Sequence, residues 1–248
     1  MRFYKLKTLA LLPLLILSSL SIHASTLEIG TIGLPPYGIN EQTTTSGLYY
    51  DLANLVTSHA GYQANNKTSP YARIIKEIKF GVIDLTIMFR NPALDEYVDY
   101  VAPLPSLKTV VIGLQGNNFK NIDSLKGKKI AYLRGGKFSD EIDNNKNIIK
   151  YPINNYTQGI KMLIAGRADA IIGPLDPIIR SSLQFEDNSV VFADPLVVDQ
   201  RTPWIQVSKN SHKNIDIDKL KESFLQMQGE DILNELRSKY IDYPYLTN

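Results

Sequence analysis

Residues 69–89, SPYARIIKEIKFGVIDLTIMF, carry the pattern that decides the fold. The opening Ser69-Pro70 predicts the start of a helix, because Ser is a frequent N-cap and Pro suits the first helical position. Isoleucines 74, 75 and 78 follow at helical spacing and predict one apolar face. The stretch ends in DLTIMF, a run typical of a buried strand. A helix followed by a buried strand indicates an α/β domain with parallel strands.

The same alternation extends in both directions along the chain. Strands are expected at Leu27–Gly33, Leu107–Gly113, Lys129–Leu133, Ala168–Gly173, Val190–Ala193 and Trp204–Val207, and helices at Gly47–Ala60, Ile160–Ala165, Pro174–Leu183 and Asp218–Tyr240. Gly229 is expected to break the last helix in two. No exact repeat is visible, although the rhythm implies two similar α/β halves.

The first 24 residues predict a secretory signal. Arg2, Lys5 and Lys7 precede an apolar stretch, and Ala24 is a small residue at the expected cleavage site. A transmembrane anchor is the alternative, but the uncharged run from Thr8 to Ala24 is shorter than the ~20 residues needed to span a bilayer. Without the signal, the 27 Lys and Arg fall by three to 24, against 25 Asp and Glu. The formal charge then changes from +2 to −1, which does not favour a polyanion-binding surface.

The sequence contains no Cys. A lipoprotein anchor, disulfides, thiolate metal sites and a Cys nucleophile are therefore excluded. An exported, nearly neutral chain without Cys fits the bacterial periplasm best, as a protein that is not a lipoprotein.

Seven short blocks follow one another in an order that resembles a known family. They are Pro35-Pro36-Tyr37, Gly47–Leu52 (GLYYDL), Gly81–Asp84 (GVID), Val98–Pro103 (VDYVAP), Leu125–Ala131 (LKGKKIA), Gly166–Ala170 (GRADA) and Trp204–Lys209 (WIQVSK). Together they resemble the family 3 extracellular solute-binding proteins, best known as the amino-acid receptors of ABC importers. The resemblance covers essentially all of the chain after the predicted signal.

The resemblance implies a two-lobed α/β protein of the type II periplasmic-binding-protein fold, with two crossover strands as the hinge. Lobe 1 would take residues 26–111 and 196–248, and lobe 2 residues 112–195. It further implies a monomer that closes around a small-molecule solute, needs no cofactor or metal, and docks on an inner-membrane ABC permease or on a sensor or chemoreceptor.

Candidate ligand-binding residues combine charge with a position near the expected cleft. Arg90 follows the apolar strand and Arg73 lies one turn into a helix, and a guanidinium can bind both oxygens of a carboxylate. Tyr37 follows the Pro-Pro turn, where the resemblance implies an aromatic wall, and Tyr71 belongs to a Pro-Tyr-x-Arg start that resembles a divergent branch of the family. Each residue has a plain alternative, as a solvated cation or a packing aromatic.

Three further candidates lie in the second half of the chain. Arg134 and Gly135 follow a predicted strand, where backbone N–H groups at a helix start could hold an anion. Asp176 could neutralise an ammonium group. An ordinary turn and a helix cap are the alternatives.

The departures from the family pattern concern the ligand more than the fold. The position of the carboxylate-clamping Arg falls on Leu94, that of the second-lobe hydroxyl on Gly136, and that of the ammonium-binding Asp on Pro174. The α-amino-acid clamp is thus absent at its matching positions, and Arg90 and Asp176 would have to substitute from nearby.

The sequence therefore predicts a periplasmic receptor that captures a small polar, carboxylate-bearing solute, such as an amino acid, for an ABC importer. One alternative is a free-standing receptor for a signalling partner. Another is a periplasmic lyase on the same fold, although His59 and His212, the histidines left after signal removal, lie in no catalytic motif.

Overall fold

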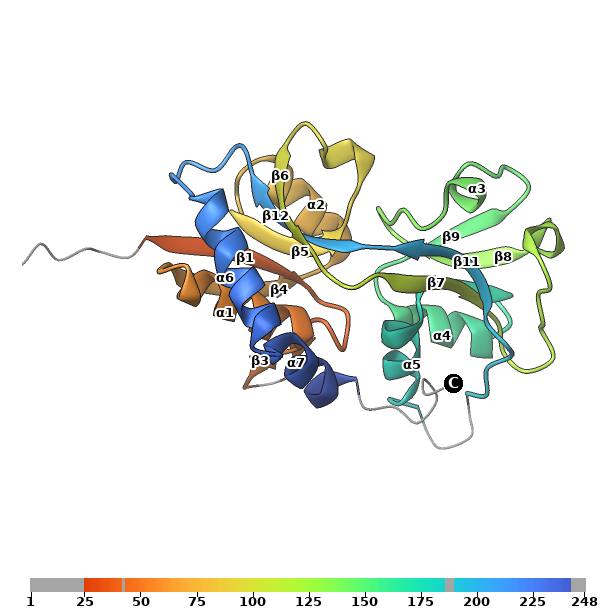
Figure 1. Cartoon of the computed structure of the whole chain (residues 1–248). Coiled ribbons are helices and arrows are strands. Elements are labelled where there is room, and N and C mark those ends of the chain that lie inside the picture. Colours follow the sequence, from red (N-terminus) through yellow and green to blue (C-terminus); the bar gives the residue numbers. More distant parts are fainter. Residues whose placement is uncertain (1–24, 42, 186–189, 242–248) are drawn as a thin grey trace, which may run out of the picture.

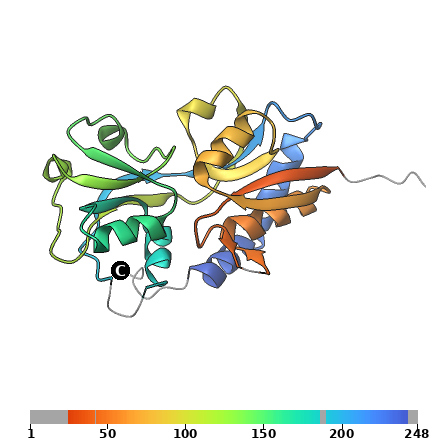
Figure 2. The ribbon, with the colours of Figure 1, turned by 180° about the vertical axis from the view of Figure 1, so that it is seen from behind.

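The computed structural model describes residues 25–41, 43–185 and 190–241. The predicted signal, residues 1–24, lies outside the described residues. Figure 1 shows two α/β bodies side by side, and Figure 2 shows the same arrangement from behind. Each body is built around a five-stranded sheet. The predicted α/β class with two lobes is confirmed.

The first lobe contains a sheet with the strand order β4-β1-β5-β12-β6. Its strands are β1 (Thr26–Ile32), β4 (Gln63–Ser69), β5 (Leu85–Phe89), β6 (Val98–Pro103) and β12 (Pro203–Ser208), beside a small hairpin of β2 (Ile39–Asn40) and β3 (Thr45–Ser46). Strands β4, β1 and β5 are parallel, and β12 returns antiparallel to β5 and β6. The helices are α1 (Leu48–His59), α2 (Tyr71–Lys79), α6 (Ile217–Gly229) and α7 (Ile232–Tyr240), with a 3₁₀ turn at Pro92–Leu94.

The second lobe repeats this plan with the order β11-β7-β10-β8-β9. Its strands are β7 (Leu107–Ile112), β8 (Lys129–Leu133), β9 (Ile149–Ile153), β10 (Ala170–Pro174) and β11 (Leu196–Arg201). Its helices are α3 (Asp140–Asp143), α4 (Tyr156–Ile164) and α5 (Leu175–Ser182), with a 3₁₀ turn at Ile122–Leu125.

The sequence prediction missed all four strands at the edges of the two five-stranded sheets, β4, β6, β9 and β11, and placed one strand wrongly. Strand β4 has the sequence QANNKTS and pairs along its whole length with β1, while β9 pairs with β8 at an edge of the second sheet. Their pairing partners, rather than an apolar pattern, hold these edge strands in place. The strand predicted at Val190–Ala193 is wrong, because only an isolated bridge joins Phe192 to Leu114.

The chain passes between the two sheets at two places. Residues 104–106 lead from β6 to β7, and Thr202 separates β11 from β12. The hydroxyls of Ser106 and Thr202 lie 2.6 Å apart and join the two crossings. Because β7 and β11 both belong to the second sheet, the predicted lobe limits at 111 and 196 fall within β7 and at the first residue of β11.

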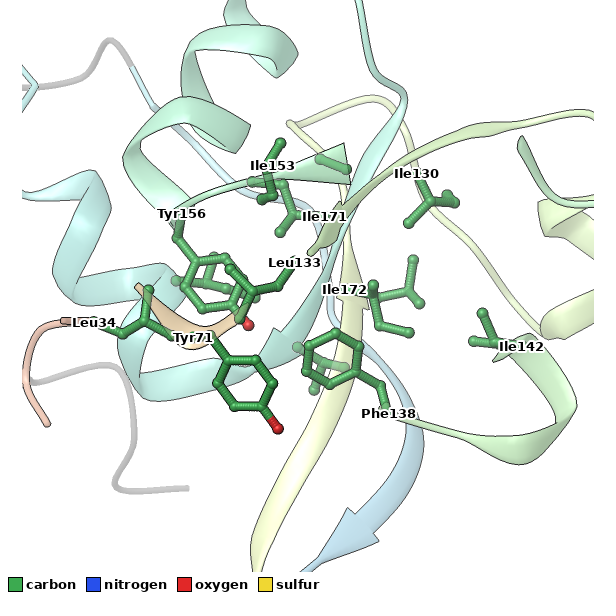
Figure 3. Packing of buried hydrophobic residues seen from close by; sticks show 14 of the residues in the cluster. Leu34, Tyr71, Ile130, Leu133, Phe138, Ile142, Ile153, Tyr156, Ile171 and Ile172 are labelled. Atoms are coloured by element: carbon green, nitrogen blue, oxygen red, sulfur yellow. The ribbon is translucent and has the colours of Figure 1, made fainter. Parts of the chain in front are cut away.

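Two clusters of buried hydrophobic residues form the core. One packs α1, α6 and α7 against a face of the first sheet, with Leu52 and Phe224 among its members. The other begins at the α2 side of that sheet, with Ile74, and continues into the second lobe, where it includes Ile171 and Tyr156. Figure 3 shows this second cluster from close by. The two lobes therefore meet through apolar contacts.

Candidate functional site

A small cavity of about 30 Å³ lies where the lobes meet. Its lining is apolar or aromatic throughout: Ile32, Leu34, Tyr37, Tyr49, Tyr71, Met88, Phe89, Leu107, Leu133, Phe138, Tyr156, Pro174, Pro177 and Pro203. We call it the aromatic cavity. No charged side chain lines it among the described residues. Solute sites commonly combine such an apolar wall with a few polar groups, and here the phenol hydroxyls are the polar groups available.

Helix starts bring most of these tyrosines to the cavity. Tyr71 is the first residue of α2, Tyr156 is the first residue of α4, and Tyr49 is the second residue of α1. The Asn155 side chain caps α4 by accepting a hydrogen bond from the Gln158 backbone N–H at 2.8 Å. Elements of both lobes thus converge on one aromatic space.

Tyr37 is fixed by the helix that follows its loop. Its carbonyl oxygen accepts hydrogen bonds from the backbone N–H groups of Tyr49, at 2.9 Å, and Tyr50, at 3.2 Å. These N–H groups belong to the first turn of α1, where backbone N–H groups have no hydrogen-bond acceptor within the helix. The rings of Tyr37 and Tyr49 stack with centroids 4.3 Å apart. Gly47 is required before this turn, because its φ is +127° and a Cβ would lie 2.6 Å from the Tyr37 carbonyl oxygen.

The hydroxyls of Tyr37 and Tyr156 are buried without a hydrogen-bond partner. The Tyr49 ring stacks on that of Tyr37, but the Tyr37 hydroxyl gains no hydrogen-bond partner from it. Burial, followed by the charges of Tyr49, Asp176 and Tyr156, raises the pKa of Tyr37 well above its ordinary value. Burial also raises the pKa of Tyr156. Both groups are therefore neutral phenols, able to donate and accept a hydrogen bond.

Of the seven predicted site residues, only Tyr37 and Tyr71 line the aromatic cavity. Arg90 follows β5 as expected, but its side chain lies elsewhere. The guanidinium carbon is 4.1 Å from the centre of the Tyr100 ring and 5.8 Å from that of Trp204, and one guanidinium nitrogen is 3.8 Å from an Asp95 carboxylate oxygen. About half of the Arg90 side chain is exposed.

Arg90 lines a second hollow, which we call the polar groove. Its volume is about 330 Å³, and its lining residues are Arg90, Asp140, Asp199, Gln200, Arg201, Thr202 and Trp204. Two arginines face two aspartates there, so the groove has no excess of positive charge. The sequence predicts that Arg90 binds a carboxylate in the cleft. In the structure its side chain lies outside the aromatic cavity.

The three other cationic or backbone candidates also lie outside the cavity. Arg73 is on the exposed side of α2, and Arg134 is exposed after β8. The backbone N–H of Arg134 donates to the Ile153 carbonyl oxygen at 2.8 Å, as that of Gly136 does to the Leu133 carbonyl oxygen. Gly135 packs against the first lobe, because a Cβ there would lie 3.1 Å from the Ile75 side chain.

Asp176 lies in the first turn of α5, close to the cavity but not in its lining. Burial raises the pKa of its carboxyl group above the ordinary value of 3.8, and the charge of Arg237 partly opposes that rise. Arg237 belongs to α7 of the first lobe. The opposite charges of Asp176 in the second lobe and Arg237 in the first therefore attract each other across the junction of the lobes.

Arg201 is an interlobe contact that the sequence did not indicate. One guanidinium nitrogen donates to the Lys137 carbonyl oxygen of the second lobe at 2.5 Å, and the other donates to the Arg90 carbonyl oxygen of the first lobe at 2.8 Å. The Asn91 side chain adds a longer contact of 3.5 Å to the Gly135 carbonyl oxygen. The bonds from Arg201 to Arg90 and from Asn91 to Gly135 therefore connect the two lobes.

The sequence model of one protein family, the bacterial extracellular solute-binding proteins, family 3, matches residues 27–243 of this chain. The chain belongs to that family. No curated protein sequence matches it at a significant level.

Solved structures agree with this solute-binding protein in fold. An ancestral arginine-binding protein bound to glutamine is 21% identical, with a TM-score of 0.74 over 88% of this chain and 99% of that chain. The GluR0 ligand-binding core of Nostoc punctiforme, in complex with L-glutamate, is 18% identical, with a TM-score of 0.73 over 88% and 100%. A histidine kinase sensor domain similar to periplasmic binding proteins is 14% identical, with a TM-score of 0.75 over 89% and 96%. At these identities the likeness establishes the fold alone.

Sequence reasoning overlooked most of the cavity of this solute-binding protein. Tyr156 follows Asn155 at the start of α4 in the same way as Tyr71 follows Pro70 at the start of α2. An aromatic at the first position of a helix in each half was therefore a usable signal. Within the described ranges, no helix is long and apolar enough to cross a membrane, and no cluster of three or more His, Cys, Asp or Glu side chains could hold a metal ion.

Proposed function

We propose that this chain is a periplasmic receptor that closes its two lobes around a small solute in the aromatic cavity and presents the closed form to an inner-membrane ABC permease. The observation that carries the proposal is the origin of the cavity walls. Tyr37 and Tyr71 come from the first lobe, and Phe138 and Tyr156 come from the second. A solute held there contacts both lobes, so its binding favours the closed form that a partner can distinguish from the open one.

The sequence predicts a carboxylate-bearing amino acid or a related compound as the solute, and such compounds are the first candidates to test. Arginine, glutamine and glutamate are named for proteins of the same fold. A thermal-shift screen of amino acids, dicarboxylates and small neutral metabolites tests the receptor function directly. Ligand at a hundredfold excess over Kd should stabilise the protein by about 2.7 kcal/mol. If no solute raises the melting temperature, the receptor function is refuted.

A second role, as the receptor of a signalling partner, is supported by the histidine kinase sensor domain among the structural neighbours. Both roles need a closed, solute-bound form. The two roles separate when the solute-loaded protein is added to the permease in proteoliposomes. Stimulated ATP hydrolysis supports import, whereas binding to a sensor domain without such stimulation supports signalling. Chemical conversion of a stabilising solute during a long incubation would instead support the lyase alternative.

A further inference from the structure

We propose that the solute of the aromatic cavity is an uncharged molecule with an apolar body and one hydroxyl or carbonyl group, which bridges the hydroxyls of Tyr37 and Tyr156. This inference rests on the proposed receptor function and names the solute class of the same site. It differs from the carboxylate-bearing amino acid that the sequence predicts.

The lining of the cavity argues against a charged solute. Moving an ion out of water is costly unless an opposite charge or several hydrogen bonds replace the water. Arg73, Arg90 and Arg134 all lie outside the lining, and the charges of Arg237 and Arg201 act on Tyr37 and Tyr71 from outside it. A carboxylate in the cavity would therefore have no guanidinium among the residues that line it. The acidic candidate Asp176 also lies outside the lining, and the charge of Arg237 acts on it.

The two unpartnered hydroxyls argue for one polar group on the solute. Tyr37 is 4% exposed and Tyr156 is fully buried, and neither hydroxyl has a protein partner. A buried hydroxyl without a hydrogen-bond partner is unfavourable. A ligand oxygen that bonds to both hydroxyls would supply the hydrogen bonds that they lack. Tyr37 and Tyr156 line the same cavity, although the two residues belong to different lobes. A single bridging oxygen would therefore link the lobes.

Gly173 shows how the Tyr156 hydroxyl reaches this position. A Cβ on Gly173 would lie 2.0 Å from that hydroxyl, so the phenol fits only because β10 carries glycine at this point. Figure 3 shows the Tyr156 ring extending from α4 toward Leu34, Tyr71 and Leu133, which all line the cavity. The hydroxyl is thus directed toward the lobe junction.

The apolar remainder of the solute has a matching surface in the same space. The stacked rings of Tyr37 and Tyr49 form one wall, and Phe138 and Pro177 contribute to the wall from the second lobe. The cavity of about 30 Å³ has room for one or two water molecules. A six-membered ring needs more room than this. The lobes would therefore enclose such a solute while slightly farther apart than in this structure, after movement at the two crossings near Ser106 and Thr202.

Matched ring compounds test the proposal. Cyclohexanol, cyclohexanone and benzyl alcohol are compared in a thermal-shift titration with cyclohexylamine and cyclohexanecarboxylate, which carry a charge on the same ring. L-Phenylalanine, L-arginine and L-glutamate complete the panel. The proposal expects a saturable rise in melting temperature with uncharged compounds only. A rise with amino acids alone would refute the proposed solute class but leave the receptor function standing. A panel without any rise would refute both.

The variants Tyr156→Phe and Tyr37→Phe test the bridging hydroxyls, with Tyr151→Phe on β9 as the control. Removing an unpartnered buried hydroxyl should raise the melting temperature of the solute-free protein by roughly 2–4 °C. The same change should weaken cyclohexanol binding at least tenfold, while Tyr151→Phe should change neither quantity. Unchanged cyclohexanol binding in both cavity variants, or a lower melting temperature without solute, would overturn the proposed bridge.

Discussion

The aromatic cavity and the polar groove begin at neighbouring residues of one strand end, yet they differ in chemistry. Phe89 lines the cavity, whereas Arg90, the next residue, lines the groove. Successive side chains of extended backbone point in opposite directions, so one residue step moves a guanidinium from one hollow to the other. Position at a strand end therefore does not establish that a charged side chain faces the cleft. The following predictions test this contrast.

The largest effect is expected for Tyr156→Ala. Tyr156 is fully buried at the junction of both lobes, and truncation of a buried aromatic side chain costs about 3–5 kcal/mol. Urea unfolding measures the loss. The control Tyr151→Ala removes a phenol that is 38% exposed and should cost less than about 1 kcal/mol. Equal losses for the two variants would contradict the importance of the cavity.

Gly173→Ala should follow, at about 1–3 kcal/mol, because the added methyl group overlaps the Tyr156 phenol. The double variant with Tyr156→Phe should recover part of this loss, since the closest atom, the hydroxyl oxygen, is gone. Chemical denaturation of the two single variants and the double variant measures the coupling. Strict additivity would mean that the hydroxyl lies away from Gly173.

Arg201→Ala should cost about 1–2 kcal/mol, because it removes two charge-assisted hydrogen bonds, one of which crosses from the second lobe to the Arg90 carbonyl oxygen of the first. Small-angle X-ray scattering should also report a larger average radius of gyration, since the closed arrangement loses this support. An unchanged radius together with unchanged stability would show that the apolar junction alone holds the lobes closed.

Asp176→Asn tests the half-buried charge beside the cavity. A carboxyl group whose pKa is higher in the folded than in the unfolded state binds protons on folding. Stability from this group is therefore present at low pH and is lost as the pH rises from the ordinary value of 3.8 through the raised folded value. The asparagine variant should lack this decline and melt at a higher temperature than the wild type at neutral pH. A steeper decline in the variant would reverse the assignment.

Arg90→Ala should have the smallest effect. The side chain is half exposed, and its closest carboxylate contact is 3.8 Å long, so the cost should be below about 1 kcal/mol. The thermal shift produced by cyclohexanol should be unchanged, because the guanidinium lies outside the aromatic cavity. Loss of that shift with the fold intact would place Arg90 in the solute site, as the sequence predicts.

The order of most buried helices and strands could be predicted from the sequence, because their apolar residues recur at helical spacing or in short continuous runs. The apolar strand DLTIMF became β5, and the break expected at Gly229 separates α6 from α7. The edge strands β4, β6, β9 and β11 escaped prediction, and β4 did so because pairing with β1 holds its polar sequence in place without an apolar pattern. The family blocks with Gly-x-x-Asp are structural. Asp84 accepts hydrogen bonds from the Glu28 backbone N–H and from Lys213, and Asp169 accepts one from the Lys129 backbone N–H.

The candidate site was harder to predict because a binding cavity depends on side-chain direction and on contacts between distant segments. Tyr37 and Tyr71 were identified from a turn and a helix start, and both line the cavity. Arg90 was placed correctly at its strand end, but its side chain packs on Tyr100. Tyr156 and Gly173 form a pair only after α4 packs on β10, a contact that local sequence does not reveal.

A crystal structure of the protein grown with cyclohexanol tests the central claim most directly. The account predicts electron density for the ring inside the aromatic cavity, with its oxygen within hydrogen-bond distance of both the Tyr37 and the Tyr156 hydroxyls. Density in the polar groove beside Arg90 and Trp204, with none between the two tyrosines, would contradict it.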